Sequence, residues 1–411
     1  KVASRDNLIA AAQHVISNKG APGIDNMAVE ELLPYLEKHG DELVGRIMNG
    51  KYWPKPLRRV EIPKPGGGIP TAIDRMIQQA IAQVLTPILE PIFSEYSFGF
   101  RPGRSAHDAV GKAKEYYDMG YEYVVDIDMA KFFDTLNHDM LIRMLREYVY
   151  DLTLIRLIRK FLKCGVVMMD GLCSPTVEGA PQGGPLSPLL SNLYLTKFDR
   201  VLEERGLKFV RYADDCNIYV KSSRAAERVM KSCTAFLEGK LKLKVNREKS
   251  KVGSPIKLKF LGFAMWKIGD KSGIRIHEKS ERRFKDKVKM LTKRNRGYSP
   301  GYICFTLKKF LTGWLGYYRL ASLKSKAKNW DGWIRRRIRA FIWKKWKLPK
   351  ARYKNLRKLG IGKEEAWKWA NTRKGYWRIA RSQILQSTLT NTVLEGYGLV
   401  SISKMFELAG R

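Results

Sequence analysis

Two apolar stretches that read as β-strands each end in aspartates. FVRYADDCNIYV places Asp214 and Asp215 between apolar flanks, and YVVDIDMAKFFD places Asp126 and Asp128 two positions apart, on one face of a strand. Adjacent aspartates alone are common in turns, because the short side chain hydrogen-bonds its own backbone. The apolar flanks, however, predict buried strands that hold the acids rigidly. Carboxylates at the ends of two strands indicate a divalent-cation site, since Mg²⁺ prefers oxygen ligands.

The charge balance predicts an anionic partner. The 411 residues include 77 Lys and Arg but 40 Asp and Glu, a formal net charge of +37. Phosphates bind such a surface with counterion release, so nucleic acid is the first expectation and an anionic membrane surface the alternative. A pair of Mg²⁺ ions that activates a hydroxyl and stabilises a leaving pyrophosphate, beside a basic groove for nucleic acid, describes a polymerase.

The sequence shows no run of 18 or more uncharged apolar residues, so we expect no transmembrane helix. No signal peptide is recognisable at Lys1, although the chain does not begin with Met. The five cysteines are scattered without a CxxC pair. This usage predicts a reducing compartment and argues against a zinc module or a disulfide framework.

The length predicts roughly two to four domains. After about Lys271 acids become rare while Lys, Arg and Trp become frequent, so we place a domain boundary there. Hydrophobic spacing predicts helices within 1–50, over 74–93, from about Asn137, at the end of 180–206, over 225–241 and from 331 to Pro349. Strands are predicted at the start of 58–70, at the start of 121–139 and over 258–266, and a β-hairpin is predicted over 209–222.

The motifs occur in the order of a known family. YADD with DIDMAKFFD upstream resembles the palm of reverse transcriptases, and RRVEIPKPGGG, DRMIQQAIAQVLTPILEP, SFGFRPGRSAHDAV, PQGGPLSPLLSNLYL, LKVNREKSK and LKFLGF follow the order of the group II intron reverse transcriptase/maturase family over about residues 55–263. GWLGYYRL, GWIRRRIR and NTRKGYWR resemble its maturase portion. The resemblance therefore covers most of the chain.

The resemblance implies an α+β right-hand polymerase, with fingers and a palm built on an antiparallel sheet. The implied order is an N-terminal helical extension (1–50), fingers and palm (51–271), an α-helical thumb or maturase domain (272–345) and a basic, DNA-binding-like C-terminal segment (346–411). No Cys follows Cys304 and no His follows His277, so we expect no DNA endonuclease domain.

The resemblance also assigns the catalytic acids. The family places a bulky aromatic five residues after its first catalytic aspartate, and Phe133 stands five residues after Asp128. Asp128, Asp214 and Asp215 are therefore the expected catalytic residues. With the backbone carbonyl of Met129 they are the expected ligands of two Mg²⁺ ions, for which Mn²⁺ can substitute. We expect Asp126 to be a structural acid beside the site.

The same resemblance implies which residues contact the incoming dNTP. Lys64 and Arg75 are the expected triphosphate clamp, Phe133 the gate that excludes a ribose 2′-hydroxyl, and Gln182 a contact to the nucleotide or template. Lys249 is either the general acid that protonates pyrophosphate or a phosphate contact. The family usually has a few more residues where Gly68 here runs directly into IPT, so the finger loop is shorter than expected.

Nucleic-acid contacts are expected along two basic, aromatic regions. One comprises Arg101, Arg104, Pro181 and Gly183. The other reads either as a solvated helical face or as an RNA-binding thumb surface, and on the second reading it comprises Trp314, Arg335, Arg336, Arg337, Lys344 and Lys345, with Trp333, Trp343 and Trp346 beside them. His107 and His138 are expected to be structural.

The expected function is RNA-directed DNA synthesis for a group II intron, together with intron RNA binding that assists splicing and mobility. The implied partners are intron RNA, an RNA template with a DNA primer, dNTPs and target DNA. The implied location is the bacterial cytoplasm as a ribonucleoprotein, or an organelle in a eukaryotic host. Two alternatives stay open: a protein that is mainly an RNA-binding splicing cofactor, and a reverse transcriptase of a retron or phage-defence system.

Overall fold

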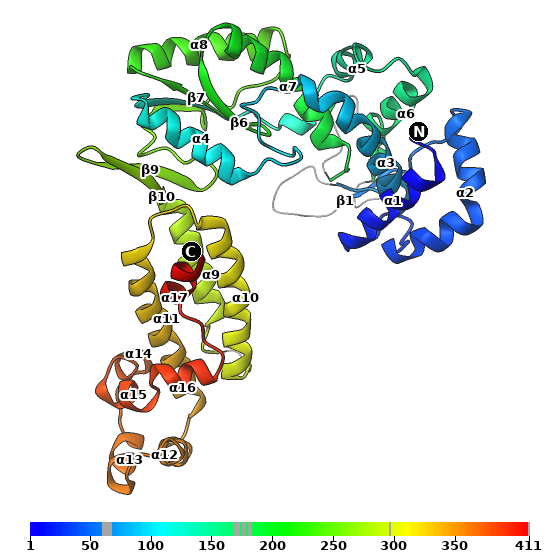
Figure 1. The fold of residues 1–411 in the computed structure, drawn as a ribbon. Coiled ribbons are helices and arrows are strands. Elements are labelled where there is room, and N and C mark those ends of the chain that lie inside the picture. Colours follow the sequence, from blue (N-terminus) through cyan, green and yellow to red (C-terminus); the bar gives the residue numbers. More distant parts are fainter. Residues whose placement is uncertain (60–67, 168–172, 175–177, 180–182, 296, 410–411) are drawn as a thin grey trace. The chain divides into compact units, whose positions relative to one another are not determined.

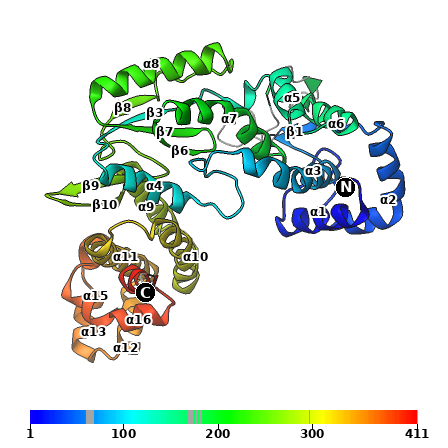
Figure 2. The same cartoon turned by 45° about the horizontal axis from the view of Figure 1, so that its top comes forward.

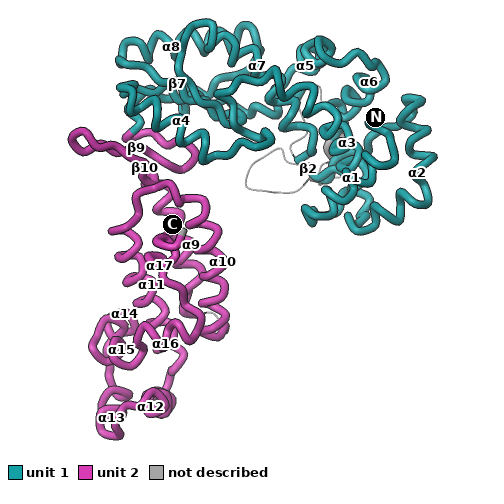
Figure 3. Tube along the Cα trace, in the orientation of Figure 1, with its two compact units in different colours: residues 1–255 teal, residues 256–411 magenta. Residues whose placement is uncertain are grey.

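The computed structural model divides the chain into two compact units, Lys1–Pro255 and Ile256–Arg411 (Figure 3). It describes residues 1–59, 68–167, 173–174, 178–179, 183–295 and 297–409. The architecture is mixed α+β and mostly helical with small sheets, as the sequence predicts (Figure 1). No helix in the described ranges is long and apolar enough to cross a membrane.

The elements of the first unit follow the predicted order closely. Its helices are α1 (Arg5–Ser17), η1 (Val29–Glu31), α2 (Leu32–Met48), α3 (Ala72–Leu89), η2 (Glu90–Ile92), α4 (Ala106–Asp118), η3 (Phe132–Asp134), α5 (His138–Arg146), α6 (Leu152–Leu162), α7 (Ser187–Glu204) and α8 (Ser223–Gly239). Its strands are β1 (Leu57–Arg59), β2 (Gly68–Ile69), β3 (Tyr123–Ile127), β4 (Val166–Val167), β5 (Cys173–Ser174), β6 (Lys208–Tyr212), β7 (Asp215–Val220) and β8 (Lys251–Gly253).

The sheet that carries the aspartates has the order β6-β7-β3-β8, and all its neighbouring strands are antiparallel. Helix α8 packs against β3, β7 and β8, while α4 packs against β6. Both helices lie along the sheet, on opposite sides of it (Figures 1 and 2). Because both faces are covered, β7 is buried from Cys216 to Val220 instead of alternating with solvent. The predicted buried strands are therefore confirmed.

The N-terminal helices pack against the first long helix after them. The Asn7 side chain donates to the Ala80 carbonyl at 3.0 Å and accepts from Gln83 Nε2 at 2.8 Å, which joins α1 to α3. Helix α3 begins where the Thr71 hydroxyl accepts the Asp74 amide, an N-cap. A second sheet, of order β2-β1-β4-β5, belongs to the same unit.

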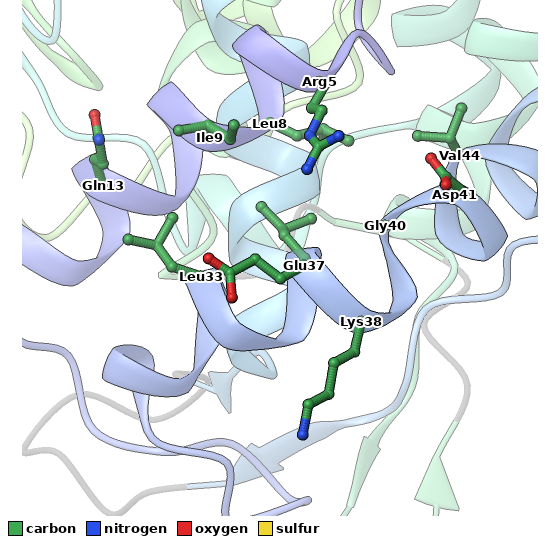
Figure 4. A pocket seen from close by; sticks show the side chains of 11 residues that line it. Arg5, Leu8, Ile9, Gln13, Leu33, Glu37, Lys38, Gly40, Asp41 and Val44 are labelled. Carbon is green, nitrogen blue, oxygen red and sulfur yellow. The ribbon is translucent and has the colours of Figure 1, made fainter.

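A pocket of about 280 Å³ lies between α1 and α2 (Figure 4). Its lining mixes apolar side chains of both helices with polar and charged ones, among them Arg5, Glu37 and Asp41 (Figure 4). None of the residues that the sequence predicts for the site lines this pocket.

The second unit begins with a hairpin of β9 (Phe263–Ile268) and β10 (Lys271–Ile276). Its helices are α9 (Glu278–Leu291), α10 (Pro300–Tyr318), α11 (Lys324–Lys345), α12 (Pro349–Lys358), α13 (Lys363–Ala370), α14 (Tyr376–Ile379), α15 (Gln383–Thr388), α16 (Asn391–Gly396) and α17 (Ile402–Ala409). Helix α17 packs on α10 and α11. The sequence predicts one helix up to Pro349, but α11 ends at Lys345 and Pro349 opens α12, because proline suits the first helical turn.

Candidate active site

Strand pairing brings the predicted aspartates to one end of the sheet. In the β3–β7 ladder Asp126 lies opposite Asn217 and Ile127 opposite Cys216. Antiparallel register continues by one step on each strand, so position 128 falls opposite Asp215, the first residue of β7. Tyr212 pairs with Asp215, which leaves Ala213 and Asp214 as a two-residue hairpin turn. Asp128, Asp214 and Asp215 therefore lie at the same end of the sheet, where β3 ends and the hairpin turns.

The backbone of Asp128 is held by the LKVNREKSK segment. The Asp128 amide donates to Ser250 Oγ at 3.0 Å, and its carbonyl accepts the Asn246 amide at 2.8 Å. The Ala130 amide donates to the Lys244 carbonyl at 2.8 Å, and these bonds do not use the Met129 carbonyl. The ammonium of Lys249 lies 3.9 Å from Asp128 Oδ1. Asp128 and Lys249, each predicted separately for the site, thus lie side by side although they are far apart in sequence.

A buried arginine lies directly beneath the hairpin turn. Arg211 and Asp199 are both fully buried, and the guanidinium meets the carboxylate with two bonds, Nε to Oδ1 at 2.7 Å and Nη2 to Oδ2 at 2.6 Å. Arg211 Nη1 donates to the Ala213 carbonyl at 2.9 Å and to Asn192 Oδ1 at 3.0 Å. The guanidinium therefore ties the turn residue before Asp214 to two side chains of helix α7.

Gly99 lets a second segment approach the same turn. A Cβ atom at Gly99 would lie 2.3 Å from the Ala213 amide nitrogen, a distance that two packed atoms cannot hold. The Gly99 carbonyl accepts from Asn192 Nδ2 at 2.8 Å, and the Phe98 amide donates to the Arg211 carbonyl at 2.8 Å. Ala213 itself has a positive φ of 56°. The turn is thus enclosed by backbone on one side and by Arg211 beneath.

The donor set at this end of the sheet suits a hard cation. Carboxylate oxygens and a backbone carbonyl are the ligands that Mg²⁺ takes in proteins. Within the described ranges, however, no three His, Cys, Asp or Glu side chains are grouped closely enough to hold a metal ion. The donor chemistry therefore fits magnesium, while the ligand set of two ions stays a prediction.

A second cavity in the same unit is lined by two of the residues predicted to bind the dNTP, Arg75 and Phe133, and is called the nucleotide cavity below. It has a volume of about 590 Å³ and is lined by Arg75, Phe133 and Gly183, together with Phe100 and His14. Gly183 has a φ of +103°, a conformation that favours glycine. Phe133 is half-buried, and its ring meets that of Phe132 edge-on at 5.3 Å. The structure thus places Arg75 and Phe133, predicted to bind the dNTP, in one cavity with Gly183, predicted to contact nucleic acid.

Arg75 and its neighbour Asp74 are both buried. Arg75 Nη2 donates to the Ala21 carbonyl at 2.9 Å, and burial lowers the pKa of its guanidinium. Asp74 accepts from the Tyr52 hydroxyl and from the Thr71 hydroxyl, each at 2.7 Å. Burial raises the pKa of Asp74 to about 6 despite these bonds. Asp74 therefore holds Tyr52 and Thr71 together at the start of α3, next to Arg75 in sequence.

Arg101 is used inside the protein instead of on a nucleic-acid surface. Its side chain is 8% exposed and pairs with Glu90, at 2.8 Å from Nη2 and 2.9 Å from Nε. Nη1 donates to the carbonyls of Ser94 and Ser97, and Nη2 also reaches the Glu90 carbonyl. All five donors of the guanidinium are therefore occupied, which corrects its predicted template contact. Arg104 is half-buried over the Phe98 ring and donates to the Glu95 carbonyl.

Two of the predicted aromatic contacts, Trp314 and Trp343, pack against other side chains of the second unit. Trp314 is half-buried and packs on Phe284 at 4.4 Å and on Tyr318 at 4.6 Å. Trp343 is fully buried, with Arg352 over its ring. Trp343 is therefore not available to a base, and the alternation of Trp with Lys and Arg in this region partly reflects helix packing. The half-buried Trp333 carries Arg337 over its ring.

Of the five basic residues predicted on α11, two line a pocket, and two others hydrogen-bond to residues outside the helix. Arg335 and Arg336 line a pocket of this unit. Arg337 donates to Thr292 Oγ1 at 2.5 Å and to the Lys289 carbonyl, so it joins α11 to α9. Lys345 is exposed and donates to the Gly297 carbonyl at 3.1 Å, and Lys344 is half-buried.

The other predicted residues are three in undescribed segments and the two histidines. Lys64, Pro181 and Gln182 lie outside the described residues. His138 is buried with Nε2 at 2.5 Å from the Gly179 carbonyl, and burial lowers its pKa, which agrees with a structural role. His107 lies on α4, away from the residues that line the nucleotide cavity.

Sequence reasoning missed two parts of the site. The first is the network of Arg211, Asp199 and Asn192, whose only signal is one charged residue inside the apolar strand FVRY. The second is the contribution of α1, whose His14 and Asn18 line the nucleotide cavity. Nothing in the α1 sequence indicates this, because its place depends on long-range packing against α3.

Known proteins resemble this chain in two regions. Residues 62–265 match the reverse transcriptase (RNA-dependent DNA polymerase) family, and residues 281–360 match the group II intron maturase-specific domain. Protein YkfC of Escherichia coli (strain K12) is 34% identical over 290 residues, which cover 60% of this chain and 76% of YkfC. The group II intron-encoded protein LtrA of Lactococcus lactis subsp. cremoris is 33% identical over 252 residues, which cover 58% of this chain and 41% of LtrA.

Among solved structures, a chain of a partial Cas6-RT-Cas1–Cas2 complex is similar, with 25% identity and a TM-score of 0.37, over 58% of this chain and 42% of that chain. The matched region spans less than half of LtrA.

Proposed function

Because the chain belongs to the family of group II intron reverse transcriptases and maturases, and so carries an RNA-directed DNA polymerase domain, we propose that it copies RNA into DNA at the end of β3 and β7. The observation that supports this site most strongly is the β3–β7 register, which sets Asp128 opposite Asp215 beside the Asp214 turn. The match of residues 281–360 supports a second role, in which the chain binds intron RNA to assist splicing and mobility.

The acids at the end of β3 and β7 bind and orient the reacting groups. Asp128, Asp214 and Asp215, with the Met129 carbonyl, would hold two magnesium ions, which when bound lower the pKa of a primer 3′-hydroxyl and neutralise the leaving pyrophosphate. The hydrogen bond that the Asp128 amide donates to Ser250 and the one that its carbonyl accepts from Asn246 fix the backbone of Asp128, and Arg211 fixes the turn before Asp214. The protein therefore holds its carboxylates in place before substrate arrives.

Four residues are proposed to set the fit of the nucleotide. Phe133 in the nucleotide cavity occupies the space that a ribose 2′-hydroxyl would need, which favours dNTPs. Arg75 lines the same cavity and supplies positive charge for the triphosphate, and Lys64 is proposed as its partner. Lys249, beside Asp128, either donates a proton to the pyrophosphate oxygen or binds a phosphate as a fixed charge.

Primer extension tests the proposed function. The full chain is incubated with a DNA primer annealed to an RNA template, with dNTPs or rNTPs, and with Mg²⁺ or a chelator. We expect dNTP extension that the chelator abolishes, and little extension with rNTPs. Exchange of Phe133 for Ala should raise the use of rNTPs, and Phe132→Ala, which changes the buried neighbour, is the matched control. Equal use of rNTPs by the wild type and the Phe133 variant would contradict the sugar gate.

A further inference from the structure

A pocket of the second unit is lined by four arginines. It has a volume of about 650 Å³, and Arg335, Arg336 and Arg339 reach it from α11, while Arg381 reaches it from the turn after α14. Gln386, Thr390, Asn391 and Trp333 complete most of the lining. The helices that form the pocket lie around the same stretch of α11 (Figure 1).

No carboxylate balances these arginines. The lining of the pocket contains no Asp or Glu among the described residues. Asp331 stands one helical turn before Arg335, at the usual spacing for an ion pair. Its carboxylate instead accepts the Ile402 amide at 2.7 Å, the Ser401 hydroxyl at 2.8 Å and both the amide and the hydroxyl of Ser403. The one acid near the pocket on α11 is thus used to hold the start of α17.

Two of the arginines are held by backbone atoms. Arg336 donates to the Trp377 carbonyl from Nε at 3.2 Å and from Nη2 at 2.9 Å, and its guanidinium lies 3.9 Å from the centre of the Trp377 ring. Arg339 is 9% exposed, and its Nε donates to the Leu389 carbonyl at 2.9 Å. In the described part of the chain, these bonds leave Nη1 of Arg336 and both terminal nitrogens of Arg339 for a ligand.

The arginines also repel one another. Burial, and secondarily the charge of Arg335, lowers the pKa of Arg339. Burial, and secondarily the charge of Arg381, lowers the pKa of Arg336. Collecting like charges without a counter-charge is unfavourable for the isolated protein, so the arrangement is explained best by an anion that binds there.

We propose that this pocket binds an unpaired, sharply turned strand of nucleic acid, whose phosphates lie on Arg335, Arg336, Arg339 and Arg381. The proposal rests on the proposed maturase function, which makes RNA the favoured source of that strand. Arginine forks bind phosphate oxygens in pairs, and an unstacked base can lie against Trp333.

The geometry favours a turned single strand over a duplex. A duplex presents its phosphates on a convex surface, whereas these guanidiniums line a recess formed by α11, the turn after α14 and the start of α16. Several positive charges in one recess are matched only when two or more phosphates approach it together, as they do where a strand reverses direction. Gln386, Thr390 and Asn391 add neutral groups that can bond sugar hydroxyls or base edges.

Binding of three defined probes tests the pocket. The probes are an RNA hairpin with an unpaired loop, a fully paired RNA of the same length and a DNA hairpin of the same sequence. The Arg335→Gln/Arg381→Gln variant of the full chain is compared with Lys350→Gln/Lys354→Gln, which removes the same charge from the exposed face of α12. We expect the arginine pair to raise the Kd of the RNA hairpin at least tenfold and to make its salt slope shallower by about 1.4, since two single-strand phosphate contacts are lost.

The controls separate the pocket from general charge. The paired RNA should lose no more affinity in the arginine variant than in the lysine variant. A parallel loss on the DNA hairpin would assign the pocket to any unpaired strand, and a loss confined to RNA would assign it to RNA. Equal hairpin affinity in the two variants, or equal losses on paired and unpaired RNA, would overturn the proposal.

Folding and catalysis are read out separately. The side chains of Arg335 and Arg381 form no hydrogen bond or ion pair with described residues, so the melting temperature of the Arg335→Gln/Arg381→Gln variant should not fall. Arg335→Lys/Arg381→Lys keeps the charge while losing the planar fork. The binding assay does not depend on polymerisation. A failure of the pocket therefore leaves primer extension intact, and a failure of the polymerase leaves the binding result standing.

Discussion

Two buried arginines, one in each unit, are treated in opposite ways by the fold. Arg211 is fully buried beneath the aspartate hairpin and shares two hydrogen bonds with the fully buried Asp199. Arg339 is 9% exposed in the second unit and has only the Leu389 carbonyl as a partner among described residues. The first charge is neutralised within the protein and positions a turn. The second is left for a ligand, so the presence or absence of a counter-charge separates a structural arginine from a binding one.

The largest loss of stability is expected when Arg211 is removed and the buried carboxylate of Asp199 keeps no positive partner. Arg211→Met keeps much of the volume but leaves Asp199 buried without a cation, which should cost roughly 3–5 kcal/mol of unfolding free energy. Hydrogen exchange of β6 and β7 in the full chain measures the loss. The double variant Arg211→Met/Asp199→Leu removes both charges and should recover much of it. A single variant with unchanged exchange rates would break the comparison.

Asp74 is a third buried charged group, and it has no cationic partner among the described residues. Burial instead raises the pKa of its carboxyl to about 6. The folded protein then binds a proton that the unfolded chain, with a pKa of 3.8, releases, so stability falls as pH rises from about 4 through 6. The contribution of Asp74 relative to Asp74→Asn should decrease by about 3 kcal/mol over that window. Denaturant unfolding of both proteins at several pH values checks this. Parallel pH profiles would show that the carboxyl is not perturbed.

The hairpin itself can be displaced without removing any charge. Gly99→Ala would put a Cβ atom 2.3 Å from the Ala213 amide, so the Asp214 turn must shift. We expect kcat for primer extension to fall roughly tenfold or more, as small displacements of reacting groups cost this much, with a smaller change in KM. Gly111→Ala on α4 is the matched control, because nothing lies within 4 Å of its added Cβ atom. Equal rates for the two variants would show that the turn tolerates the shift.

The smallest effect is expected at the ligand-binding arginine. Arg339→Met abandons no carboxylate and loses one bond to the Leu389 carbonyl, so thermal unfolding of the second unit should show a loss of about 1 kcal/mol or less. A loss as large as that of Arg211→Met would mean that Arg339 is a structural residue, and the contrast between the two units would disappear.

The sequence predicts the acids well because local patterns encode them. Apolar strands with Asp126, Asp128 and Asp214 at their ends specify a buried sheet, and antiparallel pairing then brings the acids together. The ion pair of Lys249 with Asp128, in contrast, is not predicted from the LKVNREKSK motif. The α+β class and the helix of 225–241 follow from the same periodicity.

The sequence predicts the aromatic and basic contacts less well, because burial is a tertiary property. Arg101 and Trp314 are residue types typical of a nucleic-acid surface, yet Arg101 pairs with Glu90 and Trp314 packs on Phe284. Conversely, Arg335 and Arg339 share one face of α11 through their four-residue spacing, but Arg381 joins them only through the packing of α14 on α11. No spacing within the chain encodes that contact.

Primer extension by three aspartate variants tests the central claim most directly, with RNA affinity measured in parallel. Asp128→Asn and Asp214→Asn should slow extension of a DNA primer on RNA by roughly a hundredfold or more while RNA affinity stays unchanged. Asp126→Asn, two residues earlier on β3 and opposite Asn217, should keep most of the wild-type rate. An Asp214→Asn protein that extends the primer as fast as the wild type would contradict the account.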